Sequence, residues 1–194
     1  MSNITNIKNI KKCILLAFLL VCLPMVANAQ RWTVSTNALS WASLGTVNAE
    51  GSYSLNQNFS VNLGGSINPW KATSPTGVTL QNKQYGGYLG IKYWPWHVYS
   101  EWWINAKLQY RNFEHLGILT QQLVTGNAVG GGLSAGYSFM LSNKFNLDVG
   151  AGIWGGKLLN YTKYQGTQPT EIEEQGTRSF FFPDNMILSL IYIF

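Results

Sequence analysis

The chain has little charge and little cysteine, and each shortage excludes a common class of protein. Only 11% of its 194 residues are charged, against about 25% in an ordinary soluble domain. Both cysteines, Cys13 and Cys22, lie within the first 29 residues, a segment with the features of an export signal. Once that segment is removed, the chain has no disulfide, no thiolate nucleophile and no cysteine ligand for a metal.

The chain also lacks an apolar run long enough for a transmembrane helix. Its longest run, residues 13–26, has about 14 residues, whereas a membrane-spanning helix needs ~20. Lysines precede this run, and the small-x-small triplet Ala27-Asn28-Ala29 follows it. We therefore predict that residues 1–29 are a cleavable signal peptide and that residues 30–194 form one domain.

A lipid anchor on Cys22 is the alternative interpretation of the signal, since residues 19–22 resemble a lipoprotein box. It is disfavoured because Val21 stands where lipoproteins carry a small residue, and because apolar residues follow the cysteine.

Removing the signal removes most of the excess positive charge. The full chain has 13 Lys and Arg against 8 Asp and Glu, a net charge of +5. Without Lys8, Lys11 and Lys12, 10 basic residues remain against the same 8 acidic ones, and the net charge falls to +2. The basic pI is therefore largely a property of the signal, and no nucleic-acid partner is expected.

Beyond the signal, apolar residues alternate with polar residues or glycine at a period of two, which is typical of strands with one apolar face. In the clearest segment, Trp102, Ile104 and Leu108 lie on one face, opposite Lys107 and Arg111. The pattern predicts eight strands, near residues 32–41, 46–55, 59–68, 85–94, 102–111, 129–139, 145–153 and 186–194.

Eight strands of about ten residues suit a bilayer, which requires tilted strands of roughly 9 to 11 residues and a closed sheet without free edges. We therefore predict an all-β fold: an eight-stranded antiparallel transmembrane up-and-down β-barrel. Charged residues within the strands all lie on the polar face, as a lipid-facing wall requires, since a charge there costs roughly 2 to 4 kcal/mol. A soluble lipocalin-type barrel would have the opposite polarity.

Short and long connections alternate along the chain. Tight turns are predicted at residues 56–58, 95–101 and 141–144, and longer polar segments at residues 71–83, 116–127 and 162–184. This alternation is typical of barrels with short periplasmic turns and longer outer loops.

The strand charges define a candidate lumenal site. If the apolar faces meet lipid, the charged side chains point inward, where an eight-stranded barrel has room only for side chains. A salt-bridge network that neutralises buried charge is the favoured interpretation, and a gated narrow pore or a ligand site is the alternative. The residues of this lumenal charge network are Glu50, Lys92, Lys107, Arg111 and Asp148.

Aromatic residues predict contact with a membrane interface and with the insertion machinery. The last strand alternates and ends on an aromatic residue, like the signal by which bacterial outer-membrane barrels are recognised for insertion. We assign this role to Leu190, Tyr192 and Phe194. An aromatic girdle is predicted around one turn, at Trp94, Trp96, Tyr99, Trp102 and Trp103.

Several short motifs resemble a known family. They are residues 37–39, 47–50, 68–70, 90–94, 130–139 and 184–194. With these motifs the chain resembles the small outer-membrane barrels of Bacteroidetes grouped as domain of unknown function 3575, themselves similar to the OmpA-like barrel. The resemblance implies a Gram-negative cell envelope and neighbours in surface or fimbrial assembly, and it implies little about activity. Where the family tends to have Arg, this chain has Lys92, which keeps the charge but loses bidentate pairing.

Catalysis and ion binding are the other classes considered. A lipid-modifying enzyme could use a Glu114/His115 pair with a loop serine such as Ser74, while His97 lies in the aromatic turn. No serine elbow, metal pair or phosphate loop accompanies them, so we expect no enzyme, cofactor or metal. Glu171, Glu173 and Glu174 could hold a cation that bridges lipopolysaccharide, but such a site needs about six oxygens.

The sequence thus predicts a structural or interaction barrel of the outer membrane with a side-chain-filled lumen. Its expected partners are outer-membrane lipid and lipopolysaccharide, the barrel-insertion machinery, and a surface or fimbrial protein that contacts the outer loops. A narrow gated pore is the alternative, and a lipid-modifying enzyme is less favoured.

Overall fold

The structure is a computed structural model that describes residues 31–42, 45–73, 79–116, 122–164, 172–184 and 186–194. The predicted signal peptide lies outside these residues. None of the helices in the described residues is long and apolar enough to cross a membrane. The elements are β1 (Trp32–Asn37), α2 (Ala38–Ala42), β2 (Val47–Ser54), β3 (Phe59–Asn68), β4 (Lys71–Thr73), β5 (Thr79–Tyr93), β6 (Glu101–Leu116), β7 (Leu123–Met140), β8 (Phe145–Tyr164), β9 (Ile172–Pro183) and β10 (Ile187–Ile193).

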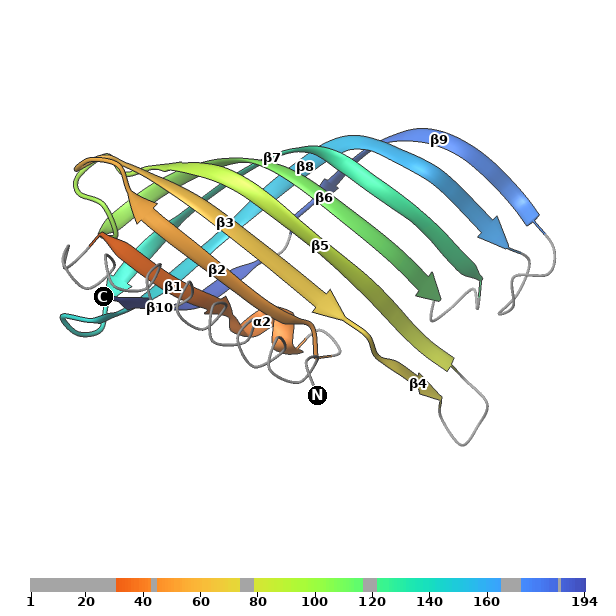
Figure 1. Cartoon of the computed structure of the whole chain (residues 1–194), viewed down its shortest axis with the longest axis horizontal. Helices are drawn as coiled ribbons and strands as arrows, with labels where there is room; N and C mark the ends of the chain where they lie inside the picture. The colour runs from red at the N-terminus through yellow and green to blue at the C-terminus, as the bar shows by residue number, and fades with distance from the viewer. Residues whose placement is uncertain (1–30, 43–44, 74–78, 117–121, 165–171, 185) are drawn as a thin grey trace, which may run out of the picture.

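Eight of these strands close into an antiparallel barrel, which confirms the predicted all-β class, strand number and closure (Figure 1). Strands β1, β2, β3, β5, β6, β7 and β8 pair in that order, and β10 pairs with both β8 and β1. Leu190 of β10, for example, lies opposite Leu147 of β8 on one side and Thr36 of β1 on the other.

The last barrel position is made of two strands placed end to end along β8. β10 pairs with residues 145–150 of β8, and β9 pairs with residues 153–164. Pro183 ends β9 because its nitrogen has no hydrogen for the ladder, and the backbone N–H of Asp184 instead donates to the carbonyl of Gly152 at 2.7 Å. The prediction of one outer loop over residues 162–184 was therefore wrong for most of its length.

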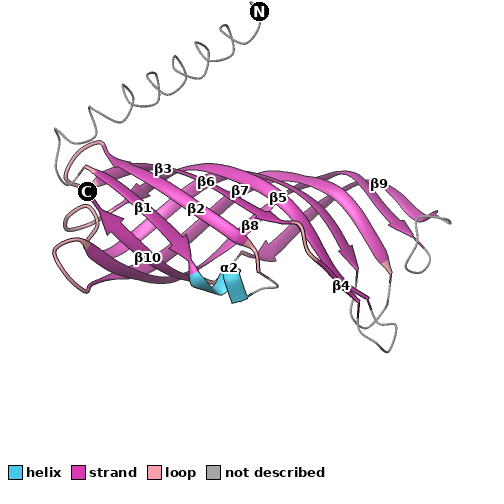
Figure 2. Cartoon of the chain, turned by 60° about the horizontal axis from the view of Figure 1, so that its bottom comes forward, coloured by secondary structure: helices cyan, strands magenta, loops and turns pink. Residues whose placement is uncertain are grey.

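One wall of the barrel is much taller than the other. Strands β5 to β9 run on past the ends of β1, β2 and β10, where α2 lies at the rim (Figures 1 and 2). Residues 79–83 and 123–127, predicted as loops, belong to β5 and β7. Polar segments can extend a sheet in this way because the ladder is made by backbone groups.

The first strand is shorter than predicted, because β1 ends at Asn37 and does not continue to Trp41. The side-chain oxygen of Asn37 accepts a hydrogen bond from the backbone N–H of Leu39 at 3.1 Å. This is the contact of a helix N-cap, and it starts the short helix α2.

The two faces of the wall have opposite polarity. The interior carries buried serine, asparagine and charged side chains, among them Ser60, Asn62, Asn105 and Asp148. The exterior carries exposed apolar side chains, among them Leu63, Leu89, Ile104, Leu108 and Leu133. This distribution is the reverse of that in a water-soluble domain. Interior glycines make room for large rings, since a Cβ on Gly64 would overlap Tyr88 and one on Gly136 would overlap Trp103.

Candidate functional site

A buried lysine joins two carboxylates near the short turns. Lys92 of β5 lies between Glu50 of β2 and Asp148 of β8, with its Nζ 3.2 Å from Glu50 Oε1 and 3.5 Å from Asp148 Oδ2. Glu50 also accepts hydrogen bonds from the Tyr88 hydroxyl and from Asn62 Nδ2. We refer to Glu50, Lys92 and Asp148 as the turn-side cluster. It holds two negative charges and one positive charge.

A second cluster lies farther along the lumen, toward the rim formed by the tall wall. Lys107 and Arg111 both lie on the interior face of β6, separated by one further inward position, Gln109. Both pair with Asp184. Lys107 Nζ contacts Asp184 Oδ2 directly, and Arg111 Nη2 lies 3.8 Å from Oδ1. Lys107 lies over the Tyr88 ring at 5.0 Å. We refer to Lys107, Arg111 and Asp184 as the rim-side cluster, with two positive charges and one negative charge.

The structure thus places all five predicted charges on the interior, but it divides them into two clusters and adds a sixth. Asp184 was predicted to end an outer loop. It enters the lumen because the break between β9 and β10 turns its side chain inward, where only 3% of it is exposed. The five predicted charges comprise three cations and two carboxylates. Because an unpaired buried ion is costly, this excess of one cation indicated that a further carboxylate should lie in the lumen.

Aromatic side chains close the lumen at the turn side. Trp94 and Trp103 are 0% and 1% exposed, and they pack with Val98 and Tyr99. The Tyr99 hydroxyl donates to the carbonyl of Arg31 at 3.0 Å, so the β5–β6 turn is folded into the barrel mouth.

The predicted girdle was therefore wrong for three of its five residues. Trp94 shares the inward alternation of Lys92, as Trp103 shares that of Lys107, and Tyr99 is carried inward by the turn. Trp96 and Trp102 are exposed on the outside.

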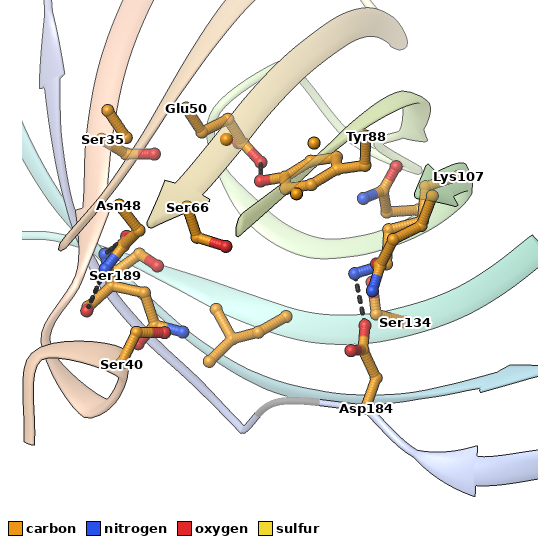
Figure 3. Close-up of a pocket in the computed structure, with 18 of the residues that line it drawn as sticks. Ser35, Ser40, Asn48, Glu50, Ser66, Tyr88, Lys107, Ser134, Asp184 and Ser189 are labelled. Carbon is orange, nitrogen blue, oxygen red and sulfur yellow. Dashed lines mark hydrogen bonds and ion pairs between the residues drawn. The ribbon is translucent and has the colours of Figure 1, made fainter. Parts of the chain in front are cut away.

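A polar cavity of about 90 Å³ lies between the two ion clusters (Figure 3). A second hollow of about 210 Å³ lies at the rim and shares Ser40, Ser66 and Arg111 with the cavity. The cavity has room for a few waters, at about 30 Å³ each. Figure 3 shows its lining, which includes Ser35, Ser40, Asn48, Glu50, Ser66, Tyr88, Lys107, Ser134, Asp184 and Ser189.

The residues considered for catalysis are not brought together. Glu114 and His115 are neighbours on β6, so their side chains point to opposite faces of the sheet. The Glu114 carboxylate accepts a hydrogen bond from Gln81 and pairs with Lys83 at 3.8 Å. Ser74 lies outside the described residues. His97 lies in the β5–β6 turn, where its ring contacts the carbonyl of Val98.

Acidic residues of the predicted outer loop lie on a strand. Glu173 and Glu174 belong to β9, and Glu173 pairs with Lys163 of β8 at 2.9 Å. Glu171 is outside the described residues. In the part of the chain that the structure describes, no three His, Cys, Asp or Glu side chains gather closely enough to hold a metal ion.

The residues assigned to insertion lie on the outer face of β10 and just after it. Leu190 and Phe194 are each 45% exposed. The Tyr192 ring contacts the rings of Phe145 and Phe194, with centroids 5.2 and 5.0 Å apart. The backbone N–H of Phe194 donates to the carbonyl of Trp32 at 3.1 Å, which ties the last residue to the start of β1.

Comparison with known proteins gives one family match. A family model described as "Protein of unknown function (DUF3575)" matches residues 14–194, which includes all the described residues. No curated protein matches the sequence.

Proposed function

Since the chain belongs to the DUF3575 family of proteins of unknown function, we propose its role from the barrel itself: it spans the outer membrane of a Gram-negative cell as a structural and interaction protein. The observation that carries the proposal is the reversed polarity of the wall. Leu63, Leu89, Leu108 and Leu133 lie on the outside and are each more than half exposed, while the side chains of the turn-side and rim-side clusters lie in the lumen. In water each of these leucines would forgo about 1.5 to 3 kcal/mol of burial, and a bilayer provides that burial.

The proposed orientation places the short turns in the periplasm and the tall wall outside the cell. The predicted alternation of short and long connections supports this orientation, which is that of OmpA-like barrels. The end of the chain, with Leu190, Tyr192 and Phe194, is proposed to be read by the barrel-insertion machinery. Lipid and lipopolysaccharide would surround the wall, and the exposed strands β5 to β9 offer a surface to a protein partner, such as one in surface or fimbrial assembly.

We propose that the lumen is a filled core and not an open pore. Two ion clusters occupy it, and the rings of Trp94 and Trp103 pack with Val98 and Tyr99 at its turn side. The polar cavity of about 90 Å³ favours a narrow pore as the second candidate, which would require the β5–β6 turn to move out of the barrel mouth. A catalytic role is not proposed, because Glu114 and His115 face opposite sides of β6.

Localisation and orientation can be tested together in a Gram-negative host that expresses the full chain. We expect the protein in the outer-membrane fraction, with a folded form that migrates differently on an unheated gel. A cysteine at Thr177 of β9 should react with an impermeant reagent on intact cells, and a cysteine at Gln57 in the β2–β3 turn should react only after lysis. Recovery in a soluble fraction would contradict the membrane proposal, and the reverse labelling pattern would contradict the orientation.

A further inference from the structure

Arg111 is a largely enclosed cation without a close partner. Its side chain is 23% exposed, and it makes no hydrogen bond to any residue in the described part of the chain. Its ion-pair distance to Asp184 is 3.8 Å, beyond hydrogen-bond range, and Asp184 is in direct contact with Lys107. A guanidinium has five N–H donors, and no Arg111 nitrogen is among the buried, unpaired side-chain atoms of the described residues, so these donors are accessible to a ligand.

The guanidinium is held in place by packing. It lies over the ring of Trp154 at 5.1 Å, so its plane is supported while the N–H groups at its edge stay free. Arg111 stands where the cavity meets the rim hollow of about 210 Å³. Ser40, Ser66 and Gln84 also line this hollow and add hydroxyl and amide groups around the guanidinium.

The charges of the lumen are balanced in total but separated along it. The turn-side cluster has one negative charge in excess, and the rim-side cluster has one positive charge in excess. The positive excess lies on the rim side, where Arg111 lines the rim hollow. Inside a low-dielectric wall such an excess concentrates anions more strongly than it would on a surface.

We propose that the rim hollow binds a small oxyanion, a carboxylate or phosphate group, and that Arg111 is the residue that holds it. The planar fork of arginine matches such groups in a bidentate manner, and the Trp154 ring orients the fork before the ligand arrives. The deeper cavity suits water, because Asn105 Oδ1 and Asp184 Oδ1 are buried acceptors without hydrogen-bond donors among the described residues. The proposal goes beyond the membrane role and does not depend on it, since the site is built inside the barrel.

The chain has three arginines, which makes a direct measurement feasible. In the 15N-labelled full chain, folded in neutral detergent, the side-chain Nε–Hε signals of Arg31, Arg111 and Arg178 can be followed during titration with inorganic phosphate and with acetate. We expect the Arg111 signal to shift and saturate. Arg178 lies on exposed β9 and should follow ionic strength alone. If the Arg111 signal also follows ionic strength alone, the proposal is wrong.

A further titration separates two sources of the same chemistry. Short-chain phosphatidic acid carries the phosphate on a lipid, and inorganic phosphate carries it free. Saturation by either supports the site, and the ratio of their midpoints tells which source is preferred.

Two variants test the role of the fork and of the local charge, with the side-chain amide of Gln84 as the reporter. Arg111→Lys keeps the charge and loses the fork, and it should weaken phosphate binding roughly tenfold, whereas Arg178→Lys should not change it. Asp184→Asn removes the competing carboxylate and should tighten binding roughly tenfold. Unchanged affinity in both Arg111→Lys and Asp184→Asn would overturn the assignment. If either variant fails to fold, the titration of the unmodified chain still decides the matter.

Discussion

Replacing Leu108 by lysine distinguishes a lipid-facing wall from a water-facing one. Leu108 lies in the middle of the barrel part of β6, between Leu89 of β5 and Gly131 of β7, and is 71% exposed on the outside. In water, such a surface substitution changes stability by no more than about 0.5 kcal/mol. Near the middle of a bilayer the same lysine costs roughly 2 to 4 kcal/mol, which corresponds to a roughly 30- to 1000-fold shift in the folding equilibrium.

The assay is urea unfolding of the full chain in phospholipid vesicles, with the folded fraction read from unheated gels. Leu108→Met is the control for loss of the leucine shape. Leu141→Lys is the matched control for charge, since Leu141 is 59% exposed in the turn between β7 and β8, where a lysine near an interface costs about 0 to 1 kcal/mol. We expect Leu108→Lys to be the destabilised variant. A Leu108→Lys barrel within about 0.5 kcal/mol of the parent in vesicles would refute the lipid-facing wall.

Three further predictions concern the lumen, the end of the chain and the closed mouth. Lys92→Met should cost on the order of 3 kcal/mol of unfolding free energy in the same assay, because it leaves Glu50 and Asp148 as buried carboxylates without a cation; a neutral effect would mean that the turn-side cluster is not an ionic network. Deleting Phe194 should leave export intact and abolish outer-membrane insertion, measured by fractionation. Normal insertion would show that the insertion machinery does not require the terminal aromatic residue. The unmodified barrel should show no persistent conductance in a planar bilayer, whereas Trp103→Ala should introduce brief openings; large steady channels without the substitution would favour the pore.

Sequence alternation was sufficient to predict the eight strands that close the barrel and the charges that point inward, because a period of two assigns every side chain of a strand to one face or the other. Lys92, Lys107 and Asp148 could be placed inside without any knowledge of their partners. The same rule placed Trp103 on the same inward face of the strand as Lys107. Assigning Trp103 to the outer aromatic girdle therefore contradicted the alternation. Family membership was also readable from the sequence, since the motifs that carry the resemblance are local.

The tertiary structure alone decided which charges meet and where the strands end. Alternation does not encode the order of residues around a closed barrel, so the pairing of Lys92 with Glu50 and Asp148, from β2 and β8, depends on register and closure. Asp184 reaches Lys107 only because Pro183 interrupts the last barrel position. The height of the tall wall also could not be predicted from the sequence. Polar residues at the ends of β5 to β9 pair through backbone N–H and C=O groups, which are the same for nearly all residue types and therefore leave no pattern in the sequence.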